Sequence, residues 1–378
     1  MTTVVIATNK WTSWPDVAGA TWVPIHYVVG FARLGVEAIW VDHLRRVDPR
    51  NHVHSLEYLM TRFATAADDF GFADRWCVIY DGGARYFGLT KSELLDRASS
   101  ADLLLAISGK GLPKGSALRS IRRRAYIDVD PGFTQMWARQ VDMGLDQFDH
   151  FFTVGQNVGR PGFQAPTLGL RWHRILPPVV LDLWPANIDE DCTRFSTIAD
   201  LWGKQYIRFE GEYFGSKRDQ FLRFVDVPVQ AGRHLEIALT VHQTDHKDLR
   251  LLNRSQWRVV DPYLYAGDLH SYREYIRYSR GEFSIAKDGY VRASSGWVSD
   301  RSACYLASGK PVIVQSTGFE GTLPTEEGLL TFRTPQEAAE AIQAVDGDYL
   351  RHARAARHLA ETHFDSDRVL HTILERTC

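Results

Sequence analysis

Cysteine is scarce in this sequence, which has only four among 378 residues. They are Cys77, Cys192, Cys304 and Cys378, and no C-x-x-C pair or His/Cys ligand spacing occurs around them. A disulfide framework and a structural zinc site are therefore not favoured. Reduced thiols in a cytoplasmic protein are the simplest interpretation.

Long hydrophobic runs are missing as well. The opening residues MTTVVIATNK lack both a basic n-region and a long apolar h-region. No apolar run approaches the roughly 18–20 residues that are needed to span a bilayer. We therefore expect neither a secretion signal nor a transmembrane segment, and a cytoplasmic location.

Neither sign of charge is in excess. The chain carries 44 basic and 46 acidic residues, for a formal net charge of −2. Bulk charge therefore gives no case for nucleic acid or an anionic membrane as a partner, although it leaves room for a local basic patch. The composition, 44% hydrophobic and 24% charged, is that of a folded globular protein. At roughly 100–200 residues per domain, this length predicts two domains.

Several common motifs are absent. The Gly-Lys pair at 309–310 is followed by proline and lacks the glycine spacing of a Walker A loop, which argues against a nucleoside triphosphatase. No G-x-G-x-x-G fingerprint follows the first apolar run, and the glycines of SGKGLPKGS have the wrong spacing for an NAD-dependent dehydrogenase. The G-x-S-x-G and H-E-x-x-H patterns of hydrolases and zincins do not occur either.

What the sequence does have is a regular alternation of short apolar runs with helical spacing. The first half predicts strands at 2–7, 36–44, 76–81, 102–108, 124–130 and 150–155. After a proline-rich stretch at 175–185, the second half predicts strands at 235–241, 257–262, 282–287, 311–316 and 328–332. We expect an α/β protein of two Rossmann-like domains, 1–185 and 186–378, which face each other across a cleft. Ligands bind beyond the carboxyl ends of the strands in such sheets.

The stretch from 281 to 321 carries the clearest chemical signal. It predicts a strand, a loop of small residues, a helix that opens at Ser299, Asp300 and Arg301, and a further strand. The first turn of a helix presents free backbone N–H groups, and an arginine beside them suits a phosphate or diphosphate. Ordinary N-capping by Ser299 or Asp300 explains the same residues equally well.

This segment, SGWVSDRSACYLASGKPVIVQSTGF followed by LPTEEGLLTFRTPQEAAEAI, resembles the nucleotide-sugar donor site of GT-B glycosyltransferases. The N-terminal AGATWVPIHYVVGFARLGVEAIWVDHL resembles the first βαβ unit of bacterial members of that group. The resemblance implies the GT-B fold and a nucleotide diphosphate sugar as co-substrate, with no cofactor. Many retaining members hold the donor ribose with a glutamate where this chain has Cys304, so the stereochemical class stays open.

The resemblance also implies where the donor binds. The segment GEYFGSKRDQF follows the expected first strand of the second domain, where GT-B enzymes supply cations to the leaving diphosphate. A solvated helix start is the alternative for this segment, and Glu282 and Lys287 are equally explained as surface charges beside a strand. The expected donor-binding residues are Gly19, Ser216, Lys217, Arg218, Glu282, Lys287, Trp297, Ser299, Asp300, Arg301, Ser302, Thr317 and Gly318.

The general base is expected in the first half, because acceptors generally bind there in this fold. Asp16, in the loop after the first strand, and Asp130, at the end of a later strand, are the candidate catalytic residues. Asp128 and Asp130 also form the Asp-x-Asp pattern with which GT-A glycosyltransferases hold a divalent metal. The two-domain layout opposes that fold, so we expect no metal site. His26 lies among apolar residues of a predicted helix, which favours a core histidine.

The expected function is metal-independent transfer of a hexosyl or pentosyl group to an acceptor hydroxyl or similar nucleophile. A nucleotide-sugar epimerase on the same fold and a non-catalytic protein that binds sugar nucleotides are the alternatives. The partners are then a nucleotide-sugar donor and an acceptor that the sequence does not identify.

Overall fold

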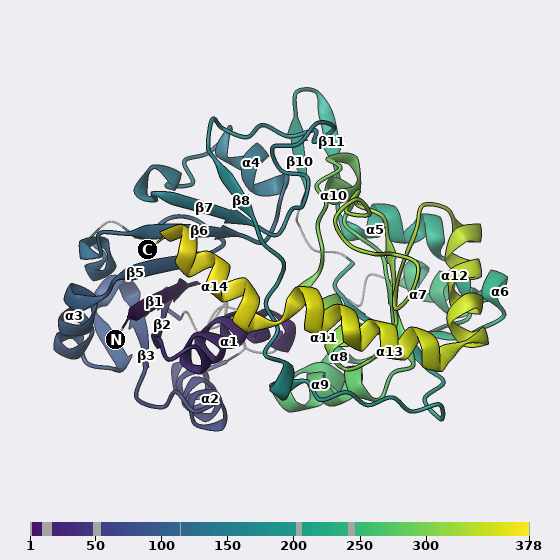
Figure 1. Cartoon of the computed structure of the whole chain (residues 1–378), viewed down its shortest axis with the longest axis horizontal. Helices are drawn as coiled ribbons and strands as arrows, with labels where there is room; N and C mark the ends of the chain where they lie inside the picture. The colour runs from purple at the N-terminus through teal and green to yellow at the C-terminus, as the bar shows by residue number, and fades with distance from the viewer. Residues whose placement is uncertain are drawn as a thin grey trace.

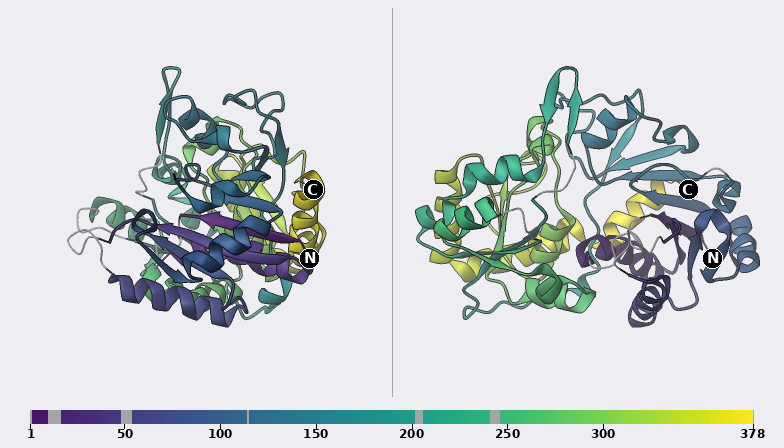
Figure 2. Two further views of the ribbon diagram at one scale, coloured as in Figure 1. Left: turned by 90° about the vertical axis from the view of Figure 1, so that its left-hand side faces the viewer. Right: turned by 180° about the vertical axis from the view of Figure 1, so that it is seen from behind.

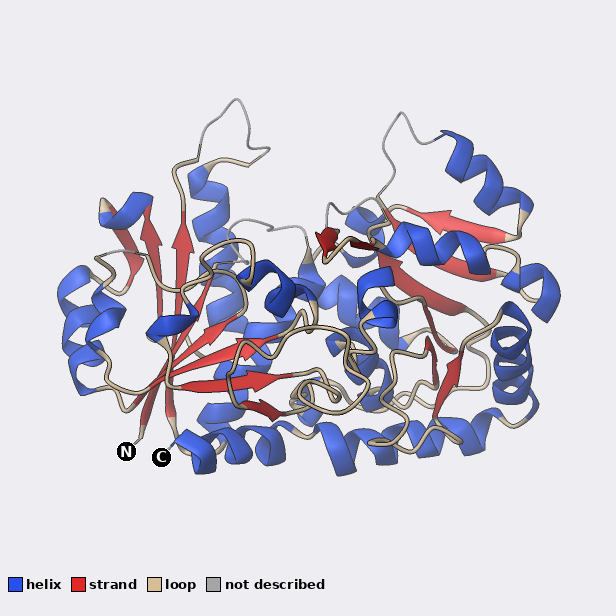
Figure 3. Cartoon of the chain, turned by 90° about the horizontal axis from the view of Figure 1, so that it is seen from above, coloured by secondary structure: helices blue, strands red, loops and turns tan. Residues whose placement is uncertain are grey.

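The computed structural model describes residues 2–9, 17–47, 54–113, 115–201, 206–240 and 246–377. Two sheets lie side by side, each flanked by helices (Figures 1 and 3). The predicted α/β class and its two Rossmann-like halves are therefore confirmed. Among the helices of these residues, none has the length and apolar content needed to cross a bilayer.

The first sheet has the strand order β4-β3-β2-β1-β5-β6-β7-β8. β4 pairs antiparallel with β3, and the other neighbours pair parallel. The strands are β1 (Thr3–Thr8), β2 (Glu37–Leu44), β3 (Trp76–Tyr80), β4 (Arg85–Gly88), β5 (Leu103–Ile107), β6 (Arg124–Asp128), β7 (His150–Thr153) and β8 (Trp172–Arg174). The order reverses at β1, which makes the carboxyl ends of β1 and β5 the expected crevice.

Helices cover the first sheet, and residues that favour helix ends mark where two of these helices begin or end. Every residue of β1 is buried, as expected for an apolar strand that helices cover on both faces. Thr90 and Glu93 form a capping box that starts α3. Gly35, with φ of +72°, follows the end of α1, where the left-handed conformation suits glycine. The helices are α1 (Ala18–Arg33), α2 (Leu56–Asp69), α3 (Lys91–Ser100) and α4 (Phe133–Ala138).

The second sheet is parallel throughout, with the order β13-β12-β9-β14-β15-β16. Its strands are β9 (Phe195–Ala199), β12 (Leu235–Leu239), β13 (Trp257–Val260), β14 (Gly281–Ser284), β15 (Val312–Gln315) and β16 (Leu329–Phe332). Its helices are α5 (Lys217–Phe221), α6 (Val227–Ala231), α7 (His246–Arg254), α8 (Pro262–Ala266), α9 (Leu269–Arg277), α10 (Asp288–Arg292), α11 (Asp300–Ala307), α12 (Pro335–Gly347) and α13 (Tyr349–Leu359). The strand order reverses at β9, so the crevice lies between the ends of β9 and β14.

A hairpin that the sequence analysis did not predict separates β9 from α5. Its strands are β10 (Ile207–Phe209) and β11 (Glu212–Phe214), and both loop residues between them have positive φ, as in a type I′ turn. Ile207 and Phe214 belong to an apolar cluster with Phe133 of α4 and Tyr290 of α10. The hairpin thus packs against helices of both halves.

The chain passes between the halves twice. The segment 175–185 leads from β8 to the second half, and a π-helical turn at 360–364 leads back to α14 (Ser366–Thr377). α14 packs against α1, and both chain ends lie on the first half (Figures 1 and 2). The two crossings touch, because Val179 N donates to Phe364 O at 2.7 Å. We still propose a domain boundary at residue 185. In the structure, α14 at the end of the chain packs on the first half.

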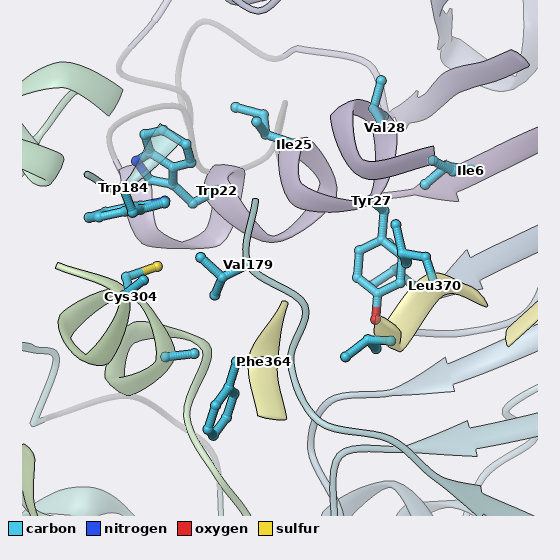
Figure 4. Close-up of a cluster of buried hydrophobic side chains, with 14 of the residues drawn as sticks. Ile6, Trp22, Ile25, Tyr27, Val28, Val179, Trp184, Cys304, Phe364 and Leu370 are labelled. Atoms are coloured by element: carbon cyan, nitrogen blue, oxygen red, sulfur yellow. The ribbon is translucent and has the colours of Figure 1, made fainter. Parts of the chain in front are cut away.

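An apolar cluster joins the halves beside these crossings (Figure 4). It brings together Trp22 of α1, Trp184 of the crossing segment, Cys304 of α11 and Phe364 of the returning chain. The ring centroids of Trp22 and Trp184 lie 4.8 Å apart. This shared core fixes the position of α11 relative to the first half.

Candidate functional site

Three cationic side chains approach one another beyond the carboxyl ends of β9 and β14. Lys217 begins α5, Lys287 precedes α10, and Arg301 lies in the first turn of α11. Burial lowers the pKa of Lys217 well below its usual value, and the positive charges of Arg301 and Lys287 lower it further. The Lys217 Nζ donates to Ile285 O at 2.8 Å. A group of cations at this end of the sheet is suited to an anionic ligand.

Arg301 is held by the protein itself. Its guanidinium donates to Glu282 Oε1, Ser284 Oγ and Ile198 O, each at 2.6 Å. Glu282 is fully buried, and its Oε2 has no hydrogen-bond partner among the described residues. Arg301 therefore ties the start of α11 to β9 and β14. The alternative that Glu282 is a surface charge is wrong, because its carboxylate is buried. Donor binding by Arg301 and Glu282 stays a prediction.

Lys287 faces the first half and forms an ion pair with Asp130. The Lys287 Nζ lies 3.1 Å from Asp130 Oδ1 and 3.0 Å from the Tyr290 hydroxyl. Tyr290 also donates to Asp130 Oδ1, and its ring stacks on Trp297 with centroids 4.4 Å apart. Asp130, which follows β6, thus meets a cation and a hydroxyl from the second half.

A buried polar network positions the two lysines. Asp288 accepts from Gly215 N at 2.9 Å and from Gln220 Nε2 at 2.6 Å. Gln315 donates to Gln220 Oε1 at 2.7 Å and accepts from Ala286 N at 3.2 Å. These bonds tie the loop that carries Lys287 to the start of α5, which carries Lys217. The sequence analysis missed this network, because it joins three segments that are distant in the chain.

Asp128 has a structural role. It is fully buried and accepts hydrogen bonds from Thr134, Gln135 and Thr153 at 2.7–2.9 Å. Burial raises the pKa of Asp128 despite these bonds. Asp128 therefore shapes the turn that presents Asp130. Among the described residues, no three His, Cys, Asp or Glu side chains gather as metal ligands would.

Trp297, Thr317 and Gly318 lie at the seam between the halves. Asn157 of the first half donates through Nδ2 to Gly318 O at 2.8 Å, and Gln156 N donates to Gly296 O at 3.0 Å. Thr317 donates to Trp297 O at 2.8 Å. The backbone oxygens of Gly296 and Gly318 thus accept hydrogen bonds across the seam, whereas the Thr317 side chain bonds to Trp297 within the second half.

The remaining predicted donor residues are spread around this centre. Ser299 accepts from Arg301 N and caps α11, while Ser302 Oγ is buried and has no hydrogen-bond partner among the described residues. Both serines line a small cavity of about 10 Å³ with Ser284 and Trp297. A cavity of this size holds at most a water molecule, so a nucleotide needs a larger opening.

Four predicted residues have other roles or lie elsewhere. Ser216 caps α5 in a capping box with Asp219. Arg218 pairs with Asp248 of α7 through two bonds of 2.7 and 2.8 Å, so a carboxylate of the protein already holds its guanidinium. Gly19 packs against Tyr272, whose hydroxyl would lie 3.0 Å from an added Cβ. Asp300 is half-buried in the first turn of α11.

Asp16, the first candidate base, lies outside the described residues. His26 is a core histidine, as predicted, because it is buried between Val180 N and the Trp184 indole nitrogen. Burial lowers the pKa of His26 to about 3. The Cys304 Sγ lies 3.7 Å from His26 Nε2 and so faces α1.

The structure therefore brings together Lys217, Lys287, Arg301, Glu282 and Asp130. Arg218 is paired with Asp248 instead, and Gly19 packs on Tyr272. Tyr290 and Gln220 were missed. The sequence carried no clear signal for Tyr290, because it lies in α10, a helix of five residues that the sequence analysis did not predict.

The two facing sheets and their crossings define the GT-B fold. Solved structures with this fold match along the whole chain at low sequence identity. An alpha-glucosyltransferase in complex with UDP and a 13-mer DNA matches with a TM-score of 0.64, 13% identity and coverage of 100% of both chains. HepE from Anabaena, in complex with UDP and glucose, matches with a TM-score of 0.58, 10% identity and coverage of 100% of this chain and 99% of that chain. A sucrose-phosphate synthase from Thermosynechococcus elongatus matches with a TM-score of 0.54, 12% identity and coverage of 100% and 98%.

Sequence comparison adds nothing to this. No protein-family model matches the chain, and no curated protein sequence matches it significantly. The likeness to the solved structures thus shows the fold.

Proposed function

We propose that this protein transfers a sugar from a nucleotide diphosphate sugar to an acceptor hydroxyl or similar nucleophile. The observation that carries the proposal is the group of Lys217, Lys287 and Arg301 at the crevice where the order of the second sheet reverses. In α/β sheets this crevice is where ligands bind. The GT-B likeness supports the same activity, because solved structures of that fold include glycosyltransferases with UDP bound.

The leaving diphosphate is the proposed ligand of the two lysines. Breaking the bond to the anomeric carbon leaves negative charge on the diphosphate oxygen, and fixed cations stabilise that charge. The ammonium groups of Lys217 and Lys287 supply the positive charge directly, and the backbone N–H groups in the first turn of α11 add to it. Arg301 acts indirectly by fixing α11 to β14 through Glu282. In this proposal no metal ion is required.

The acceptor proton is proposed to pass to an aspartate of the first half. Asp130 is one candidate, since its carboxylate already meets Lys287 and Tyr290 of the second half. Asp16 is the other candidate. Asp16→Asn and Asp130→Asn each keep size and polarity but remove basicity. The variant of the true base should lose about 10²–10⁴ in turnover, while donor affinity does not fall.

Incubation with a panel of nucleotide sugars and acceptors tests the proposal. Release of nucleoside diphosphate together with a glycosylated acceptor is the expected result, with a hexose or a pentose as the sugar. A changed sugar on an intact nucleotide would identify an epimerase. Binding without turnover for every donor and acceptor would identify a protein that only binds sugar nucleotides. We take UDP-glucose as the first donor, because one matching structure is an alpha-glucosyltransferase in complex with UDP-glucose, and a cytoplasmic location as the working assumption.

A further inference from the structure

Four exposed arginines lie at the β8 edge of the first sheet and on the neighbouring helix α14. Arg160 and Arg171 belong to the loop before β8, Arg174 ends β8, and Arg376 lies in the last turn of α14. β8 is the edge strand, and α14 lies beside it (Figure 1). We call these four residues the arginine strip.

The charges of the strip lie close together. The pKa of His173, in the middle of β8, is lowered by partial burial and by the positive charges of Arg171, Arg376, His150 and Arg174. The pKa of Arg174 is in turn lowered by partial burial and by Arg160. No acidic group is among the causes of either pKa shift. The strip is therefore a local concentration of positive charge in a chain whose net charge is only −2.

No carboxylate of the described residues neutralises the strip. None of its four guanidinium groups forms an ion pair there, whereas the acidic residues of α14 have other partners. Asp367 lies 3.5 Å from Arg33, and Glu375 lies 3.3 Å from His371. The positive charges of the strip are therefore available to an anion from outside the chain.

The form of the strip indicates which anion fits. Its cations are arginines, whose planar forks bind phosphate oxygens in pairs. They lie on three neighbouring segments, the loop before β8, β8 itself and α14, and Arg160 approaches Thr322 of the second half at 3.4 Å. Among the described residues, none of the exposed large apolar side chains belongs to β8, to α14 or to the loop before β8, so nothing here would enter a bilayer. A linear phosphate backbone fits these features better than a membrane surface does.

We propose that the arginine strip binds the phosphate backbone of a nucleic acid. The contacts are to phosphates alone, so binding is independent of base sequence and weakens as salt rises. This surface goes beyond the proposed sugar transfer and does not depend on it.

Fluorescence anisotropy with a short labelled DNA duplex and the full chain tests the proposal. Each phosphate contact contributes roughly 0.9 to the slope of log affinity against log salt, so four arginines predict a slope of about −3 to −4. Replacing Arg171→Gln and Arg174→Gln together should reduce the magnitude of the slope by about 2 and weaken binding at low salt. The matched control is Arg250→Gln with Arg254→Gln, which removes two exposed arginines from α7 and should leave binding unchanged.

Three results would overturn the proposal. They are absence of binding at the lowest salt, an equal loss in both double variants, and tighter binding to phosphatidylserine vesicles than to the duplex. Equal thermal midpoints of the two variants establish that a difference in binding comes from the removed charges.

Discussion

The Lys287 Nζ lies 3.1 Å from Asp130 Oδ1, and this ion pair joins the two halves at the mouth of the candidate site. The pair is mostly buried, with 22% and 11% of the two side chains exposed. Asp130 is thus the counter-ion of Lys287, which we propose binds the leaving diphosphate. A bound diphosphate would compete with Asp130 for the same ammonium group.

Asp130→Asn is expected to strengthen diphosphate binding and not to weaken it. The substitution removes the charge that neutralises Lys287 while it keeps the size of the side chain. Titration calorimetry with uridine diphosphate measures the change, and Asp96→Asn on the exposed face of α3 is the matched control. Weaker binding in Asp130→Asn would mean that Asp130 positions Lys287 for the ligand and does not compete with it.

Lys217→Met is expected to weaken diphosphate binding and to stabilise the free protein. Loss of one charge-assisted contact costs about 1.5–3 kcal/mol, or roughly ten- to a hundredfold in affinity. Stability should rise at neutral pH, because the wild-type fold holds a partly buried ammonium whose pKa is lowered. Lys91→Met, at an exposed lysine of α3, should change neither quantity. Unchanged affinity in Lys217→Met would remove this residue from the donor site.

The lowered pKa of Lys217 also predicts a pH dependence. The unfolded chain keeps this proton to higher pH than the folded chain, so its contribution to stability is most unfavourable at low pH and improves as pH rises between the two pKa values. An anion beside Lys217 favours the protonated form. Diphosphate binding should therefore take up a proton in that interval and weaken as pH rises. Calorimetry in buffers of different ionisation enthalpy measures the uptake, and proton release would contradict the account.

Arg301→Ala is expected to destabilise the fold by about 3–5 kcal/mol, because it leaves Glu282 buried without its partner. Adding Glu282→Gln should recover much of this loss, since no buried charge then remains. Chemical denaturation of the single and double variants gives both values. If the single variant unfolds like the wild type and loses only ligand affinity, Arg301 contacts the ligand directly.

Activity is expected to survive chelation by EDTA, because we propose that lysines and helix N–H groups stabilise the charge of the leaving diphosphate. Asp128 is already engaged by three side chains and shapes a turn. Complete loss of turnover in EDTA, with recovery in Mn²⁺, would assign Asp130 and its neighbours to a metal site instead.

The sequence predicted most strands of the two large sheets because their apolar runs are buried on both faces. It missed β4, β8 and the β10–β11 hairpin, which are three or four residues long and carry little pattern of their own. The partners of Arg301 were within reach of sequence reasoning, since Glu282 and Ser284 stand two apart on a strand and so share one face. The Asp130–Lys287 pair was not, because it joins positions 157 residues apart whose approach depends on how the two halves pack.

We propose that Lys217 and Lys287 hold the diphosphate of the donor. A crystal structure with bound uridine diphosphate would test this assignment at the atoms concerned. We expect diphosphate oxygens within hydrogen-bond distance of both Nζ atoms, beyond the carboxyl ends of β9 and β14. A diphosphate bound elsewhere, with Lys217 still bonded to Ile285 O and Lys287 still paired with Asp130, would contradict it.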